Sequence, residues 1–85
     1  MLFVPITIAA YVKLHVKSNS RADPRELEAR LRKALAAWQA GTTCDCGEPI
    51  WVIGSAVARY ACFTCITGEA VPDEDFEIAE ACRGR

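Results

Sequence analysis

Four of the five cysteines lie in two short pairs, Cys44-Asp45-Cys46 and Cys62-Phe63-Thr64-Cys65, which fifteen residues separate. Two close thiol pairs joined by a short segment can form a tetrahedral four-cysteine site around one zinc ion. Thiolates are soft ligands that suit zinc, and zinc adds no redox chemistry of its own. Gly47 and Gly68 follow the pairs and permit tight turns, in which backbone N–H groups point at the sulfurs. The pattern therefore predicts a small domain stabilised by one structural zinc ion.

The two pairs and the segment between them resemble a zinc ribbon, in which two cysteine-bearing loops lie at one end of a β-hairpin. The resemblance covers about residues 43–68, roughly a third of the chain. The first pair encloses one residue where the usual pattern encloses two, which leaves the geometry of that loop open. The ligands that the resemblance implies are Cys44, Cys46, Cys62 and Cys65.

The segment between the pairs has the composition of a hairpin. Ile50–Ile53 is rich in residues with high β propensity, Gly54-Ser55 is a turn signal, and residues 56–61 lead the chain back to Cys62. We therefore expect two short strands between Pro49 and Cys65.

Other chemistry is open to the same thiols. Cys62 and Cys65 have the spacing of a dithiol redox motif, and four cysteines can also hold a mononuclear iron ion or an iron–sulfur cluster. His15, the only histidine, is expected to be structural, with replacement of a cysteine ligand as its alternative role. Cys82 lies seventeen residues beyond the second pair and is expected to be an incidental thiol, a spare ligand or an intermolecular disulfide partner.

A helix is predicted from about Asp23 to Ala40. Asp23 is a good N-cap, Pro24 suits the first helical position, and Glu26 completes a capping box. Gly41 follows as a C-terminal stop. The apolar stripe of this helix consists of Leu27, Leu31, Leu35 and Trp38.

The flanking segments are less distinct. Residues 6–18 fit both a helical face and the alternation of a strand, and the short polar link at 19–22 favours a helix that pairs with the next one. After Gly68 the chain becomes acidic, Phe76 and Ile78 are expected to dock, and residues 79–85 are expected to fray. The predicted fold is α+β, in one domain spanning 1–85: a mainly helical part (1–41) that forms a helical hairpin or a strand plus a helix, packed on a zinc-ribbon-like β-hairpin (42–68), and then an acidic tail (69–85).

Composition indicates an ordinary globular domain, since 52% of the 85 residues are hydrophobic and 25% are charged. The net charge of −1 hides an asymmetry: residues 1–43 carry +4 and residues 44–85 carry −5. The apolar N-terminal run is short, lacks a basic start and contains Pro5. It predicts neither a signal peptide nor a membrane span, so we expect a reducing cytoplasmic location.

These features favour a non-enzymatic module that binds another protein or a second copy of itself. No histidine is paired with a nucleophile and no glycine-rich phosphate loop is present in the sequence. Nucleic-acid binding through the basic N-terminal helices is an alternative, disfavoured by the acidic ribbon half. The candidate interaction residues are the apolar Trp51, Ile53 and Phe63, which form a patch if Trp51 is exposed, and the basic Arg25, Arg32 and Lys33.

Overall fold

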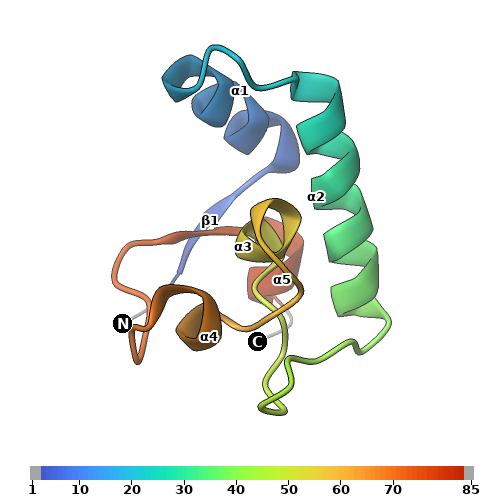
Figure 1. The fold of residues 1–85 in the computed structure, drawn as a ribbon, viewed down its shortest axis with the longest axis vertical. Coiled ribbons are helices and arrows are strands. Elements are labelled where there is room, and N and C mark those ends of the chain that lie inside the picture. The colour runs from blue at the N-terminus through green and yellow to red at the C-terminus, as the bar shows by residue number, and fades with distance from the viewer. Residues whose placement is uncertain (1–2, 84–85) are drawn as a thin grey trace.

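The computed structural model describes residues 3–83 and has an α+β architecture, as predicted (Figure 1). In these residues two long helices lie against three short ones and a two-stranded sheet, with α3 at the centre. The elements in chain order are β1 (Val4–Ile6), α1 (Ile8–Ser18), α2 (Pro24–Gln39), α3 (Val52–Val57), α4 (Phe63–Thr67), β2 (Phe76–Ile78) and α5 (Ala79–Arg83).

The ambiguous N-terminal segment is mainly helical, with a short strand before the helix. Thr7 ends the extended part and begins α1 as its N-cap, because its hydroxyl accepts a hydrogen bond of 3.1 Å from the Ala10 N–H. Ile8 and Val12 are buried one turn apart on the inner face of α1. The helical hairpin of α1 and α2 is therefore confirmed.

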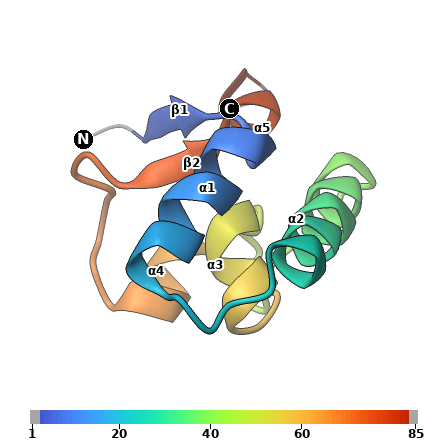
Figure 2. The ribbon, with the colours of Figure 1, turned by 90° about the horizontal axis from the view of Figure 1, so that it is seen from above.

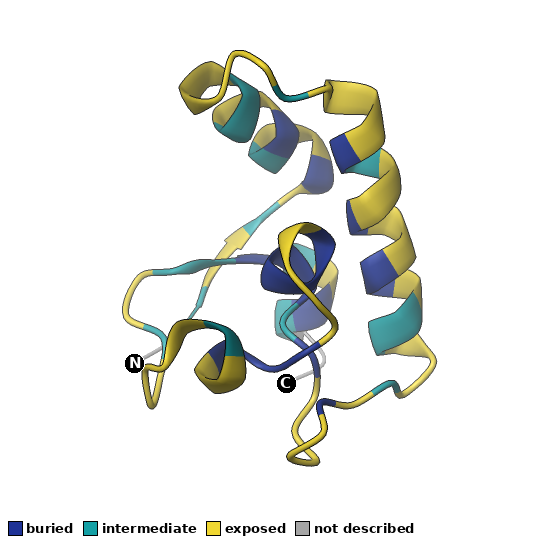
Figure 3. Ribbon diagram, viewed as in Figure 1, coloured by how far each residue is buried: buried dark blue, intermediate teal, exposed yellow. Residues whose placement is uncertain are grey.

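Helix α2 begins and ends where the sequence predicts. The Asp23 carboxylate accepts a hydrogen bond of 3.0 Å from the Arg25 N–H, and Gly41 follows the helix with a φ of +91°. Figure 3 shows the buried residues of α2 along the face turned towards the molecule's centre; they are Leu27, Leu31, Ala34 and Leu35. On the outer face, Arg30 and Arg32 each pair with a glutamate one turn earlier in the helix, at 2.7 and 2.8 Å.

The prediction of a β-hairpin between the cysteine pairs is wrong. Residues 52–57 form the helix α3, and the second pair lies at the start of α4. Helix α3 is buried around most of its circumference, and such a helix shows no amphipathic period that would distinguish it from a strand. An isolated antiparallel bridge between Thr43 and Pro49 closes the first cysteine loop.

The sheet joins the two ends of the described chain. β1 and β2 are parallel, with Val4 opposite Phe76, Pro5 opposite Glu77 and Ile6 opposite Ile78 (Figure 2). The expected docking of the tail is confirmed, since Ile78 is fully buried and Phe76 packs on the core. The fraying expected at 79–85 is wrong for residues 79–83, which form α5 with Ala81 fully buried; residues 84–85 lie outside the described part.

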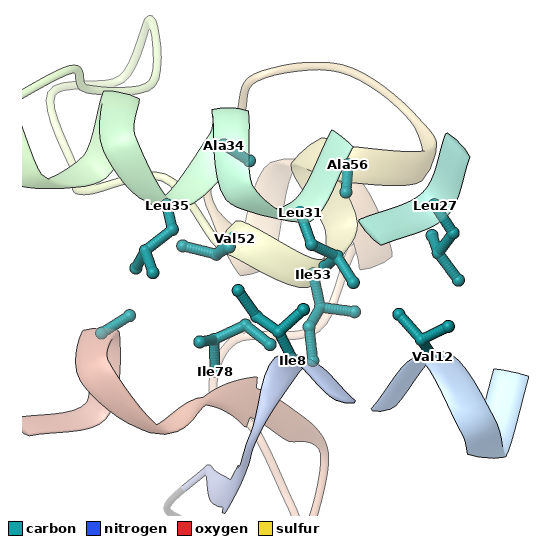
Figure 4. Close-up of a cluster of buried hydrophobic side chains, with 11 residues drawn as sticks. Ile8, Val12, Leu27, Leu31, Ala34, Leu35, Val52, Ile53, Ala56 and Ile78 are labelled. Carbon is teal, nitrogen blue, oxygen red and sulfur yellow. The ribbon is translucent and has the colours of Figure 1, made fainter. Parts of the chain in front are cut away.

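The core collects apolar side chains from both halves of the sequence. Leu31 of α2 meets α3, while Ile8 of α1 lies beside Ile78 of β2 (Figure 4). Trp38 and Trp51 pack at the edge of this cluster and are half-buried. The central helix α3 is thus fixed between α2 and the sheet, and both cysteine loops extend from its two ends.

Candidate metal centre

The first cysteine loop is a tight turn that its own backbone closes. The Cys44 N–H donates to the Glu48 carbonyl at 2.7 Å, and the Gly47 N–H donates back to the Cys44 carbonyl at 2.8 Å. Gly47 has a φ of +94°, a conformation that residues with a Cβ rarely adopt. These constraints bring Cys44 and Cys46 to the same small loop.

The second pair is held by a helix start. Cys62 is the N-cap of α4, and its Sγ accepts a hydrogen bond of 3.4 Å from the Cys65 N–H. The Ile66 N–H donates to the Cys62 carbonyl at 3.1 Å, which fixes the first turn. Gly68 ends α4 in the left-handed region, at a φ of +83°. The Cys62 and Cys65 side chains are therefore positioned by a helical turn, where the ribbon resemblance implies a hairpin end.

Helix α3 holds the two loops together. The backbone N–H of Trp51, the residue just before α3, donates to the Ala61 carbonyl at 2.9 Å. Inside α3 the buried Ser55 hydroxyl lies 3.3 Å from both the N–H and the carbonyl oxygen of Ala61. Cys44, Ala61 and Cys62 then form a small buried cluster that Ile66 covers.

The four sulfur atoms converge on one point. The Sγ atoms of the two pairs all lie within 4.8 Å of one another, and those of Cys46 and Cys62 are 3.5 Å apart. A disulfide would need about 2.05 Å, whereas a metal–sulfur bond of about 2.3 Å in a tetrahedron places neighbouring sulfurs about 3.8 Å apart. The spacing therefore matches ligands around one metal ion and excludes bonded cystines in this arrangement. These four cysteines can hold one metal ion.

The site has a closed side and an open side. Cys44 and Cys62 are 3% and 6% exposed, while Cys46 and Cys65 face solvent. Backbone hydrogen bonds from Cys46 and Cys62 lower the pKa of the Cys44 thiol to about 6. Hydrogen bonds with the side chains of Cys44, Cys62 and Cys46 raise the pKa of Cys65 to about 12. In the metal-free cluster Cys44 is thus the thiol that ionises most readily, while Cys65 keeps its proton.

Cys46 shows the same opposition of effects. A backbone hydrogen bond from Glu48 lowers its pKa, but hydrogen bonds with the Cys62 and Cys44 side chains, together with desolvation, outweigh it and raise the pKa overall. Four thiols so close together cannot all ionise without a cation, because each thiolate opposes the next. The donor set therefore suits a soft divalent metal that replaces the protons.

The remaining candidates from the sequence lie away from the sulfurs. His15 is in α1, beside the Tyr11 ring, and does not belong to the cluster. Cys82 is in α5, with its Sγ 3.8 Å from the Glu77 carbonyl oxygen, and is not part of the cluster either. The basic residues Arg25, Arg32 and Lys33 are exposed on α2.

The apolar candidates do not form an exposed patch. Ile53 is 4% exposed and belongs to the core, and Phe63 is 6% exposed. Half-buried Trp51 makes an edge-on contact with Phe63 at 5.0 Å between ring centroids, and its indole N–H donates to the Phe76 carbonyl at 2.9 Å. These side chains instead brace the second cysteine loop against β2.

Sequence reasoning missed a supporting residue, Glu77. This carboxylate is fully buried and accepts hydrogen bonds from the N–H groups of Val52, Ile53 and Ile78, at 2.9, 3.3 and 2.9 Å. It caps the start of α3 from a position 25 residues later in the chain. The alternation of apolar Phe76, polar Glu77 and apolar Ile78 is typical of a strand. Nothing in this local pattern indicates that the Glu77 side chain is buried.

No helix among the described residues is long and apolar enough to cross a membrane. Comparison with protein-family models, with curated proteins and with solved structures finds no match.

Proposed function

We propose that Cys44, Cys46, Cys62 and Cys65 bind one structural zinc ion and that the chain is a zinc-stabilised module for binding another protein. The observation that supports this most strongly is the convergence of four sulfurs within 4.8 Å from two loops that fifteen residues separate. Four thiolates are the typical ligand set of structural zinc.

The proposed role of the metal is structural and not catalytic. Four protein ligands saturate a tetrahedral ion, whereas catalytic zinc keeps a position for water or substrate. The ion would join residues 43–49 to residues 62–68. In the first loop Cys44 alone is buried, whereas Phe63 anchors the second loop through its contacts with Phe3 and Trp51. Metal binding by thiolates contributes about 10–16 kcal/mol in small zinc domains, which is comparable with the whole stability of a chain of this size.

Binding of a protein is favoured over binding of nucleic acid by the placement of charge. The cysteine loops carry the acidic Asp45 and Glu48, and a site of four thiolates with one Zn²⁺ adds two further negative charges. On α2, Arg30 and Arg32 are already paired with glutamates, which reduces the positive field of that face. A phosphate backbone would need the opposite balance.

The test begins with elemental analysis of the purified chain and thiol counting before and after a chelator. We expect one zinc ion per chain, with four thiols becoming reactive only when the metal is removed. If the analysis finds one iron ion per chain and the protein shows visible charge-transfer absorption, the bound metal is iron and not zinc. A metal-free, folded chain with reactive thiols would refute the structural site and favour dithiol chemistry at Cys62 and Cys65.

A pair of cysteine variants separates the metal from general effects of losing a thiol. Cys62→Ser is expected to lose zinc and to unfold or melt far below the parent chain, because Cys62 is both a ligand and the N-cap of α4. The matched control is Cys82→Ser, outside the cluster, which is expected to keep full zinc content. A Cys62→Ser chain with one bound zinc and an unchanged melting temperature would contradict the assignment.

A further inference from the structure

A small pocket lies directly beside the metal centre. Its volume is about 150 Å³, and Cys62 itself is part of its lining. Pockets for drug-sized molecules are about 300–1,000 Å³, so this one has room for a single side chain. Its walls come from three segments: Glu48-Pro49 at the end of the first cysteine loop, Phe63-Thr64 in the second, and Ala70 with Pro72 in the loop that follows α4.

Two aromatic side chains, Phe3 and Phe63, line the pocket. Phe3 packs edge-on against Phe63 at 5.4 Å between ring centroids and stacks on Trp51 at 6.0 Å. The outer wall is tied to α4, because the Thr64 hydroxyl donates to the Ala70 carbonyl at 3.1 Å. Aromatic and proline surfaces held in this way form a preorganised receptor for an aliphatic side chain.

The segments that line the pocket are rich in acidic residues. Glu48 lines the pocket, and the loop that forms the outer wall also carries Glu69, Asp73 and Glu74, all exposed. Arg59 is the only Lys or Arg between residues 34 and 82 of the sequence, whereas most basic residues belong to α1 and α2. Figure 1 shows α1 and α2 along the top and one side, and α4 with the loop leading to β2 at the opposite corner. The same loop exposes Val71, 58% accessible, next to the pocket.

We propose that this pocket binds a basic segment of a partner protein, with one aliphatic side chain in the pocket and its flanking Lys or Arg residues near Glu48 and the exposed carboxylates of the loop that follows α4. The inference rests on the proposed function, because the two cysteine loops supply two of the three walls. The negative charge of the metal–thiolate site lies on the same side and adds to the attraction. Zinc removal should therefore abolish the pocket together with the site.

The experiment uses the full, zinc-loaded chain and a blocked synthetic peptide, Lys-Lys-Leu-Lys-Lys. Binding is measured by calorimetry and by changes in the backbone amide resonances of Thr64 and Ala70. We expect saturable binding that weakens about tenfold or more when Ser replaces Leu in the peptide, since the buried Leu is the anchor. Binding should also weaken at high ionic strength, and Glu-Glu-Leu-Glu-Glu should not bind.

Two chain variants locate the binding. Ala70→Phe places a large side chain at the exposed edge of the pocket and is expected to abolish peptide binding. Ala36→Phe, at an exposed position of α2, is the matched control and is expected to bind as the parent does. Glu74→Asn removes one charge from the loop that follows α4, at a residue whose φ is +64°, a conformation that Asn tolerates, and is expected to weaken binding a few-fold.

Zinc content measured on the same sample separates the two proposals. A zinc-loaded, folded chain that does not bind the peptide overturns the pocket assignment alone, as does equal binding of the Ser peptide or full binding by Ala70→Phe. Peptide binding by the zinc-free chain overturns the dependence of the pocket on the metal. A chain that holds no zinc and does not bind the peptide contradicts the proposed function first.

Discussion

Replacing Glu77 by Gln tests how the two halves of the chain are joined. Its Oε2 accepts from the Val52 N–H at 2.9 Å, and its Oε1 accepts from the N–H groups of Ile53 and Ile78 at 3.3 and 2.9 Å. A glutamine keeps the shape but turns one of these oxygens into an NH₂ group. Either orientation leaves at least one buried N–H facing a donor.

The cost follows from the groups left without a partner. An unsatisfied buried N–H costs about 1–3 kcal/mol. We expect a loss of about 2–3 kcal/mol, which is a large share of the roughly 4–13 kcal/mol expected for a chain of this length. For a domain of this size the melting temperature should fall by about 10–20 °C.

The assay is thermal and urea denaturation followed by circular dichroism, with zinc held at saturation so that metal binding does not differ between samples. The matched control is Glu80→Gln, an exposed glutamate three residues later in α5, whose effect should stay within about 0.5 kcal/mol. Equal melting temperatures for the two variants would refute the role given to Glu77. A urea slope that changes along with the midpoint would show instead that the denatured or native ensemble had changed.

Gly54→Ala is expected to destabilise the chain by about 1–3 kcal/mol, because the new methyl group would collide with the Trp51 ring and lie 2.8 Å from the Ile66 Cδ1; a melting temperature equal to that of the parent in the same scan would show that this interface is loose. Zinc binding should weaken as pH falls, since protons compete for the thiolates. At pH 7.5 it should release fewer than four protons per ion, because the pKa of about 6 leaves Cys44 already ionised. Calorimetry in buffers of different ionisation enthalpy measures this number, and a value of four would contradict the assignment to Cys44.

The sequence predicts well those features that depend on residues close to one another in the chain, such as helix caps and the spacing of cysteines. Asp23, Pro24 and Gly41 mark both ends of α2 without help from the rest of the chain, and the cysteine spacing indicates the four-sulfur cluster. Residues 6–18 carry two overlapping periods, and the structure makes residues 8–18 helical, with Thr7 separating them from β1, which ends at Ile6.

The features that sequence reasoning missed depend on contacts between distant residues. Val52 and Ile53 have strong β propensity, yet the Glu77 carboxylate satisfies the N–H groups at the start of a helix there. The three-residue strands β1 and β2 are too short for periodicity, and within residues 3–83 each pairs with the other alone. Tertiary contacts thus override local propensity in the segment between the cysteine pairs, and they supply the pairing that stabilises β1 and β2.

The pairing of β1 with β2 has a consequence for the order in which the chain folds. The Val4 backbone N–H donates to the Asp75 backbone carbonyl, some seventy residues later in the sequence. This contact therefore closes a loop that contains nearly the whole described chain. Contacts of such long range form late, since the entropy of closing the loop must be lost before the pairing can stabilise it. On a ribosome, α1, α2 and the four cysteines all emerge before residue 76 does. The four cysteines are therefore available to bind a metal ion before β1 can pair with β2.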